Sequence, residues 1–387
     1  MTSAHRMALH YVLLFGATGV SLPFAGLWFR AQGLSGAEIG TLLAAPMLAR
    51  LMTGPAIAVW ADGFRARRTP IAILGLVAAL GYAATGLVEG YGLWALCWFV
   101  AASAAAGIIP LTDVLTLKLA RREGFAFSVP RGFGSAAFVI ANVVMGALLV
   151  QASVDLVIIW VVIAALLIAG VAAVVVPPEP VDTVGLQRRA DRFRGMGRLV
   201  ADPAFMIAIF AIGAVQAAHA FYYGFSAILW KAQGIAESMT GLLWAFSVVV
   251  EIGFMWWVEP WRRRAGIGPW TMLLIGALAA VVRWTAMAFA PPLWLLWPLQ
   301  AMHALSFAAT YLAGVEIVER LSPAGSQTAG QTLSSVLSAG VLIGLATALA
   351  GPLYDAYGAG AYLAMAGLAL IGAVAAFRVR QTLVRQA

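Results

Sequence analysis

The chain has 387 residues, of which 63% are hydrophobic and 10% are charged, and its formal net charge is +8. A soluble protein with so little polar surface would precipitate, so the composition excludes a soluble enzyme and predicts a membrane protein. Continuous apolar runs without alternation indicate helical spans, because membrane-spanning strands alternate in polarity. Cys97 is the only cysteine, so no internal disulfide can form.

Apolar runs of about 20 residues recur along the whole chain. They predict twelve membrane-spanning helices, six before and six after a long polar stretch. The expected spans are 7–30, 37–60, 69–89, 92–120, 130–152, 155–177, 203–231, 237–259, 269–290, 292–320, 326–351 and 359–379. The first run is too long for a signal peptide and is interpreted as an uncleaved helix.

Most Lys and Arg residues fall in alternate connections between these spans. The basic clusters lie at 65–68, 118–122, 188–198 and 262–264. Because cytoplasmic loops carry an excess of positive charge, this pattern predicts that both termini are cytoplasmic. It also explains the net charge without nucleic acid, which we do not expect as a partner.

The two halves of the chain resemble each other. The sequence ArgAlaGlnGly at 30–33 returns as LysAlaGlnGly at 231–234, and basic clusters close the second helix of each half. Such an internal repeat is typical of transporters that bind substrate between two related bundles near the membrane midplane. We therefore expect an N-terminal six-helix bundle over 1–177, a cytoplasmic linker over 178–202 and a C-terminal six-helix bundle over 203–387.

In the first half, Asp113 lies within one apolar run, the basic turn at 118–122 breaks that run, and Arg131 opens the next. A charge at the bilayer centre costs roughly 2.5–3.5 kcal/mol, so we expect the two to form a pair or a binding site. Arg50 is expected to be buried and to bind either Asp113 or a substrate carboxylate, which its planar fork suits. Asp62 and Arg65, in a basic turn, are expected to gate conformational change.

In the second half, Glu251 lies in an apolar run without a neighbouring charge. It is either protonated much of the time, as a proton-coupling residue, or paired permanently with Arg283. Arg283 and His303 are spaced to reach similar depths, and we expect them to take part in proton coupling. His219, Tyr222 and Tyr223 are candidates for substrate contact, with core packing as the alternative.

Other classes of function lack their sequence signals. There is no phosphate-binding loop for ATP, no His and Cys cluster with metal spacing and no voltage-sensor pattern. We expect no metal and no cofactor, with the proton as coupling ion. The expected partners are a small-molecule substrate, protons and the lipid bilayer, and the protein is expected to be a monomer.

These residues resemble the major facilitator superfamily, in the branch that contains the lactose permease. The resemblance covers nearly the whole chain and is carried by Asp113, Arg131, Glu251, Arg283 and His303. It implies that the last three take part in coupling and binding, and Asp62 matches a loop aspartate of that family. The chain departs from the pattern at Ser306, where the lactose permease has an essential carboxylate.

The chain is more closely similar to the phenylpropionate-permease type. The matching stretches are 48–51, 110–113, 218–228 and 281–284, with departures at Tyr311 and Glu316. The resemblance implies a proton-coupled symporter of the bacterial inner membrane that imports a small aromatic carboxylate such as 3-phenylpropionate. Two alternatives stay open, namely a sugar or nucleoside symporter of the same fold and a membrane sensor or scaffold that transports nothing.

Overall fold

The structure, a computed structural model, describes residues 1–179, 195–323 and 325–386, with side chains through residue 383. Most of the predicted linker, 178–202, lies outside the described residues. All regular secondary structure in the described residues is helical, in agreement with the predicted fold class. The first six helices are α1 (Ser3–Ala31), α2 (Gly36–Ala61), α3 (Arg68–Leu87), α4 (Tyr91–Glu123), α5 (Ser128–Leu148) and α6 (Leu156–Val174).

The helices from residue 196 onward, the first of which lies within the predicted linker, are more often interrupted. They are α8 (Met196–Ala201), α9 (Pro203–Ala217), α10 (Ala220–Ala232), α11 (Glu237–Gly253), α12 (Glu259–Arg264), α13 (Pro269–Ala288), α14 (Leu293–Ala301), α15 (Thr310–Leu321), α16 (Gln327–Ser334), α17 (Ile343–Tyr357) and α18 (Tyr362–Gln386). Three π-helical segments join some of them, at Phe254–Val258, Ala304–Ala309 and Ser335–Leu342. Such segments often occur at functional sites.

Eleven helical stretches in the described residues are long and apolar enough to cross a membrane. The last of them, Gln327–Leu383, has 57 residues and covers two of the predicted spans. A straight helix of that length would reach about 85 Å, far more than a bilayer core. A 3₁₀ turn at Gly358–Ala361 separates α17 from α18, and Gly358 has a φ of 53°. The count of twelve crossings and the cytoplasmic position of the termini remain predictions.

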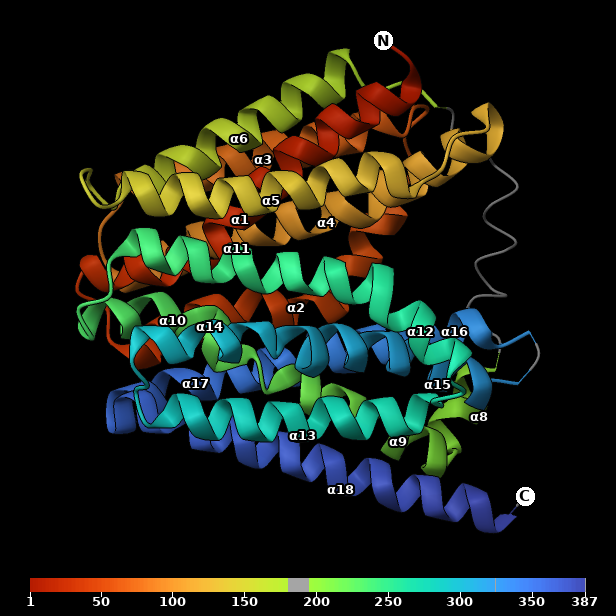
Figure 1. Ribbon diagram of the computed structural model, residues 1–387. Helices are drawn as coiled ribbons and strands as arrows, with labels where there is room; N and C mark the ends of the chain where they lie inside the picture. Colours follow the sequence, from red (N-terminus) through yellow and green to blue (C-terminus); the bar gives the residue numbers. More distant parts are fainter. Residues whose placement is uncertain (180–194, 324, 387) are drawn as a thin grey trace. The chain divides into compact units, whose positions relative to one another are not determined.

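Unit 1, one of two compact units, comprises Met1–Asp182 and Gly224–Ala245. It therefore contains most of α10 and part of α11 in addition to α1–α6. Within it, α1 packs against α5 and α6, and α3 packs against α4 and α6 (Figure 1). A close helix crossing lies between α5 and α11, where a Cβ at Gly241 would be 2.2 Å from the carbonyl oxygen of Asn142. Only glycine permits this approach.

Unit 2 comprises Thr183–Tyr223 and Phe246–Ala387. Within it, α13 packs against α18 and α15, and α9 packs against α18. A core of buried apolar side chains, including Phe205, Leu273 and Ile317, fills the space among these helices. The division into two six-helix bundles at the linker remains a prediction.

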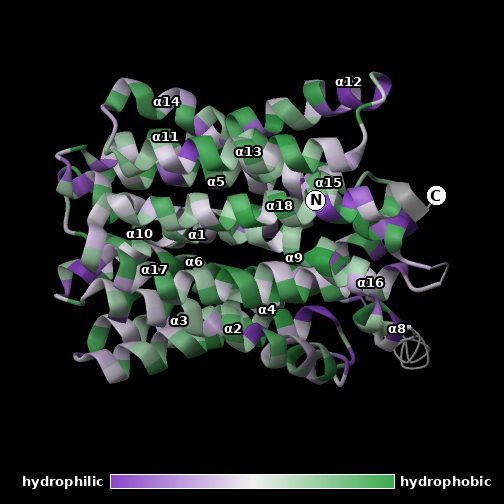
Figure 2. Cartoon of the chain, turned by 90° about the horizontal axis from the view of Figure 1, so that it is seen from below, coloured by the Kyte–Doolittle hydropathy of each residue, from purple (hydrophilic) through white to green (hydrophobic). Residues whose placement is uncertain are grey.

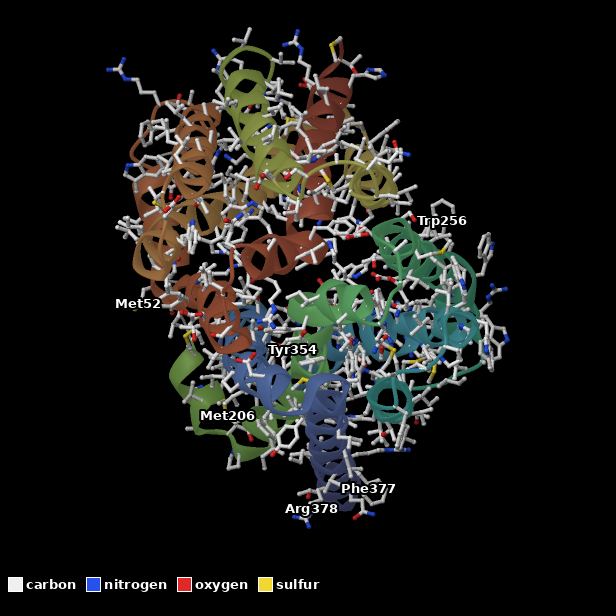
Figure 3. All side chains as sticks on the ribbon, turned by 90° about the vertical axis from the view of Figure 1, so that its left-hand side faces the viewer. Met52, Met206, Trp256, Tyr354, Phe377 and Arg378 are labelled. Carbon is white, nitrogen blue, oxygen red and sulfur yellow. The ribbon has the colours of Figure 1, made fainter. Side chains whose placement is uncertain are left out.

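Apolar side chains dominate the helix surfaces as well as the core. Hydrophobic colour runs along most of the helix lengths in Figure 2, and hydrophilic colour is concentrated at α12 and at helix ends. Met52, Trp256 and Phe377, labelled in Figure 3, are 75%, 70% and 50% exposed. Exposed apolar surface on this scale is expected where lipid takes the place of water.

Candidate functional site

Asp113, on α4, brings together side chains from three helices of unit 1. Its Oδ1 accepts a hydrogen bond from the Tyr11 hydroxyl of α1 at 2.5 Å. The same oxygen lies 3.8 Å from Nε of Arg131 on α5, so the predicted pair of Asp113 and Arg131 is present as a long ion pair. Both charged side chains are about one-third exposed, at 32% and 33%. The carboxylate is thus held more tightly by Tyr11 than by Arg131.

Arg131 is held mainly by aromatic rings. Its guanidinium carbon lies 4.0 Å from the ring centroid of Phe15 and 5.6 Å from that of Tyr11. The residue is in the first turn of α5, where the helix dipole disfavours a cation, so the rings and Asp113 must offset that repulsion. A partly exposed guanidinium on an aromatic ring is a suitable ligand for a carboxylate attached to a ring.

His10 lies beside this group and was not among the residues selected from the sequence. It is fully buried, and its Nε2 lies 3.2 Å from Oγ1 of Thr112. Its Nδ1 has no hydrogen-bond partner among the described residues. The sequence could have indicated His10 as a candidate, because it lies inside the first predicted span, where any ionisable residue is a functional candidate.

The other candidates of the first half lie on the second half of α2 and in the turn that follows. Arg50 is exposed, contrary to the expectation of a buried guanidinium, and forms no ion pair with a described residue. The physical reason is that none of the residues 47–60, all of them described, is buried. Asp62 caps the end of α2 and is half-buried, and Arg65 is exposed in the next turn.

Arg283, on α13, is the centre of a larger polar cluster in unit 2. Its side chain is fully buried. Nη1 donates to Nδ1 of His303 at 3.0 Å and to Oγ of Ser306 at 3.3 Å, and Nη2 donates to Oε1 of Gln300 at 2.9 Å. The guanidinium also lies over the rings of Trp284 and Tyr222, at 4.3 and 4.9 Å.

The hydrogen bonds around His219 determine which of its ring nitrogens carries the proton. His219 lies at the break between α9 and α10, and its Nδ1 is 3.2 Å from the carbonyl oxygens of Val215 and Gln216. Nδ1 must therefore carry the proton, which leaves Nε2 to accept from the Ser306 hydroxyl at 3.1 Å. Ser306 in turn accepts from Arg283. The residue that replaces a family carboxylate thus links two predicted site residues.

His303 links Arg283 to Glu251. Because Nδ1 accepts from Arg283, the ring proton lies on Nε2, which is 3.5 Å from Oε2 of Glu251 on α11. Glu251 is mostly buried, with 15% of its side chain exposed. In the described residues Glu251 and Arg283 form no direct ion pair, so their permanent pairing is not what the structure shows.

Aromatic side chains enclose this cluster. Tyr222 is fully buried, and its ring lies near those of Trp284 and His303, at 5.9 and 6.2 Å. Tyr223 stacks on His219 at 5.8 Å. Tyr222 therefore lies against Arg283 and Tyr223 against His219.

Four further members of the cluster were not among the predicted site residues, and only Ser306 had been named at all, as a departure from the family pattern. Trp284, Gln300, Ser306 and Tyr362 carry no charge and lie in apolar runs, so a search for ionisable residues passes over them. Gln300 offers the one usable signal, since a fully buried amide inside a membrane span must find hydrogen-bond partners.

Comparison with known proteins decides the family. The model of the MFS_1 like family matches residues 4–364, which is most of the chain. The protein belongs to the MFS_1 like family, a family of membrane transporters. The resemblance predicted from the sequence is thereby confirmed.

Two curated relatives of this MFS_1-like chain match over nearly the full length. It is 29% identical over 377 residues to a probable 3-phenylpropionic acid transporter of Escherichia coli (strain K12), covering 96% of each chain. It is 27% identical over 373 residues to a maltose permease of Geobacillus stearothermophilus, covering 94% of this chain and 91% of that protein. These relatives are named for cargoes of different chemistry.

Solved structures show the same fold at low identity. The nucleoside transporter NupG matches with a TM-score of 0.83 and 17% identity, covering 98% of this chain and 99% of that one. A bacterial homolog of the human lysosomal transporter Spinster, in an inward-facing and unoccupied conformation, matches with a TM-score of 0.79 and 16% identity, covering 99% and 97%. The chain therefore has the fold of these transporters.

Proposed function

We propose that the protein is a proton-coupled symporter that imports a small aromatic carboxylate, such as 3-phenylpropionate, by alternating access across the bacterial inner membrane. The observation that carries this proposal is the cluster in unit 2, in which a buried cation, a mostly buried carboxyl and aromatic rings are in contact. The relative named as a probable 3-phenylpropionic acid transporter supports the cargo.

Glu251 is the proton carrier in this proposal. A carboxyl in low-dielectric surroundings can alternate between a neutral and a paired state, and His303 lies beside it at 3.5 Å. Arg283 and His303 set the electrostatic environment of that carboxyl. Among the described residues Glu251 has no ion pair with Lys or Arg, and this supports a carboxyl that can release and regain its proton.

The substrate carboxylate requires a cationic ligand. Arg131 and Arg50 are the candidates of unit 1, with Asp113 as the internal partner that Arg131 gives up on binding. His219, Tyr222 and Tyr223 would contact the aromatic ring. Asp62 and Arg65 would stabilise one conformation of the α2–α3 turn and are proposed as gating residues.

A second cargo is kept because one relative is named a maltose permease. In that case Asp113 and Arg131 would bind sugar hydroxyls. The aromatic carboxylate is favoured because the polar groups in contact with Arg283 are set among aromatic rings.

Uptake into proteoliposomes tests the proposal. The purified full chain would be reconstituted and supplied with labelled 3-phenylpropionate, with and without an inward proton gradient, and empty liposomes would correct for diffusion of the neutral acid. We expect gradient-driven accumulation that a protonophore abolishes. Saturable uptake of maltose but not of 3-phenylpropionate would overturn the proposed cargo, and uptake indifferent to the gradient would overturn the coupling.

A further inference from the structure

Arg283 is a buried cation whose direct partners are all neutral. Its hydrogen bonds go to an imidazole, a hydroxyl and an amide, on His303, Ser306 and Gln300. No carboxylate of the described residues lies within ion-pair distance of it. A fully buried charge without a counter-ion is costly, so such a cation is expected to take an anion during the working cycle.

Arg283, its neighbours Gln300 and Trp284, and Tyr362, which stacks on Trp284, also hold unused hydrogen-bond donors. Nε of Arg283, Nε2 of Gln300, Nε1 of Trp284 and the Tyr362 hydroxyl are buried without a hydrogen-bond partner among the described residues. All four side chains are fully buried. Trp284 stacks on Tyr362 with ring centroids 5.5 Å apart, and Arg283 lies 4.3 Å from the Trp284 ring.

These unused groups share one chemistry. Three are N–H groups that can only donate, and the fourth is a hydroxyl that can donate. A buried donor without an acceptor carries a desolvation cost of about 1–3 kcal/mol, so four of them in contact side chains call for an acceptor. An oxyanion supplies both the acceptors and the negative charge that Arg283 lacks.

We infer that the carboxylate of the substrate binds at Arg283, among the donors of Trp284, Gln300 and Tyr362, and not at Arg50 or Arg131. This inference rests on the proposed function and names the part of the cluster that receives the anionic group. The unpaired Nε of Arg283 is available to it without loss of an existing hydrogen bond. The aromatic rings that touch the guanidinium then lie next to the ring of the substrate.

The same placement accounts for coupling. Glu251 reaches Arg283 only through His303, by contacts of 3.5 and 3.0 Å. A substrate carboxylate at Arg283 therefore brings a second negative charge to a cluster with one cation, which favours a neutral Glu251. Substrate binding and protonation of Glu251 are linked, and each promotes the other.

Calorimetric titration of the purified full chain tests this placement. Binding of 3-phenylpropionate and of its uncharged amide would be measured in two buffers of different ionisation enthalpy, which gives the number of protons taken up. For the wild type we expect preference for the acid and uptake of about one proton per carboxylate. Arg283→Lys keeps the charge but loses the fork, and should weaken binding of the acid by at least about tenfold. Arg264→Lys, at an exposed position outside the cluster, is the matched control and should bind as the wild type does.

A second variant keeps the test decisive if Arg283→Lys does not fold. In Glu251→Gln the cluster has no competing anion, so we expect the acid to bind at least as tightly as in the wild type and without proton uptake. Unchanged proton uptake in Glu251→Gln would overturn the inference. So would tight binding of the acid by Arg283→Lys together with its loss in Arg131→Lys.

Failure of the cargo can be told from failure of the site. A panel of aliphatic and aromatic acids would be titrated into the wild type. Binding of aliphatic acids alone, lost in Arg283→Lys, would leave the anion site standing and overturn the aromatic cargo. Absence of binding for every acid in the panel would overturn both.

Discussion

Nδ1 of His303 lies 3.0 Å from Nη1 of Arg283, while Nε2 of the same ring lies 3.5 Å from Oε2 of Glu251. One imidazole thus separates the buried cation from the candidate proton carrier. While Nδ1 accepts from Arg283, it has no lone pair free to take a proton, so the ring stays neutral. Proton exchange on Glu251 can then occur without breaking a direct ion pair.

Replacing Glu251 with Gln should abolish uphill accumulation of substrate and spare exchange. The amide has nearly the shape of the carboxyl and cannot carry the proton. Accumulation and counterflow would be measured in the same proteoliposomes, with Glu237→Gln as a matched control at a residue paired with Lys231 outside the cluster. Uphill accumulation by Glu251→Gln would show that another group carries the proton.

Replacing Tyr11 with Phe should release Asp113. The change removes the 2.5 Å hydrogen bond from the hydroxyl and keeps the ring on which Arg131 lies. Because Asp113 is one-third exposed, we expect a loss of stability of only about 1–1.5 kcal/mol, at the low end for a bond to a charged group. Thermal unfolding in detergent measures it, with Phe15→Tyr as a variant that adds a hydroxyl on the same helix. An unchanged melting temperature for Tyr11→Phe would contradict the importance of this bond.

Replacing Gly241 with Ala should disrupt the crossing of α5 and α11 in unit 1. The added methyl group would lie 2.2 Å from a backbone oxygen, which cannot move as a side chain can. We expect a destabilisation of about 1–3 kcal/mol or more. Gly16→Ala is the control, because a Cβ there meets nothing within 4 Å and alanine favours a helix. Equal melting temperatures for the two variants would contradict this account of the crossing.

Replacing Arg262 with Gln should destabilise unit 2 strongly. This guanidinium is 3% exposed and binds Glu259 at 2.7 and 2.8 Å, Glu316 at 3.1 Å and the carbonyl oxygen of Ile267 at 2.5 Å. Its removal takes the buried arginine partner from Glu259 and Glu316, which keep only the exposed Arg263 and Arg320, so we expect a cost of about 1.5–3 kcal/mol.

The neighbouring arginine provides the control for that experiment. Arg264 is exposed and, within the part of the chain that the structure describes, donates only to the carbonyl oxygen of Pro260 in its own helix, at 3.2 Å. Arg264→Gln should therefore change the free energy of unfolding by less than about 0.5 kcal/mol. Chemical unfolding monitored by tryptophan fluorescence compares the two, and a similar small effect for both would contradict the burial of the Arg262 network.

The sequence alone predicts the helical class because apolar runs of bilayer length leave few other structures available. It also places Asp113 near Arg131, since two helices joined by a short turn must lie side by side. Arg50 was expected to be buried because its sequence neighbours are apolar. Hydropathy cannot tell a residue that faces other helices from one that does not, and α2 buries little of its second half.

The unit 2 cluster is predicted only in its charged members. Glu251, Arg283 and His303 are conspicuous because ionisable residues are rare in membrane spans. Gln300 and Tyr362 come from helices far apart in the sequence, and neither position has a local pattern that marks it. Gln300 and Tyr362 join the cluster because α13, α14 and α18 pack together. The hydrophobic pattern of the sequence does not predict which helices pack against each other.

In the proposed function, a proton and an aromatic carboxylate cross the membrane together. The most direct test of this coupling is a measurement of internal pH in proteoliposomes that contain the wild-type chain and a trapped pH-sensitive dye. External 3-phenylpropionate is added without an imposed proton gradient. Coupled entry predicts a saturable acidification of the interior, beyond that of empty liposomes, which Glu251→Gln abolishes. Saturable entry of labelled substrate with no acidification beyond the empty liposomes would contradict it.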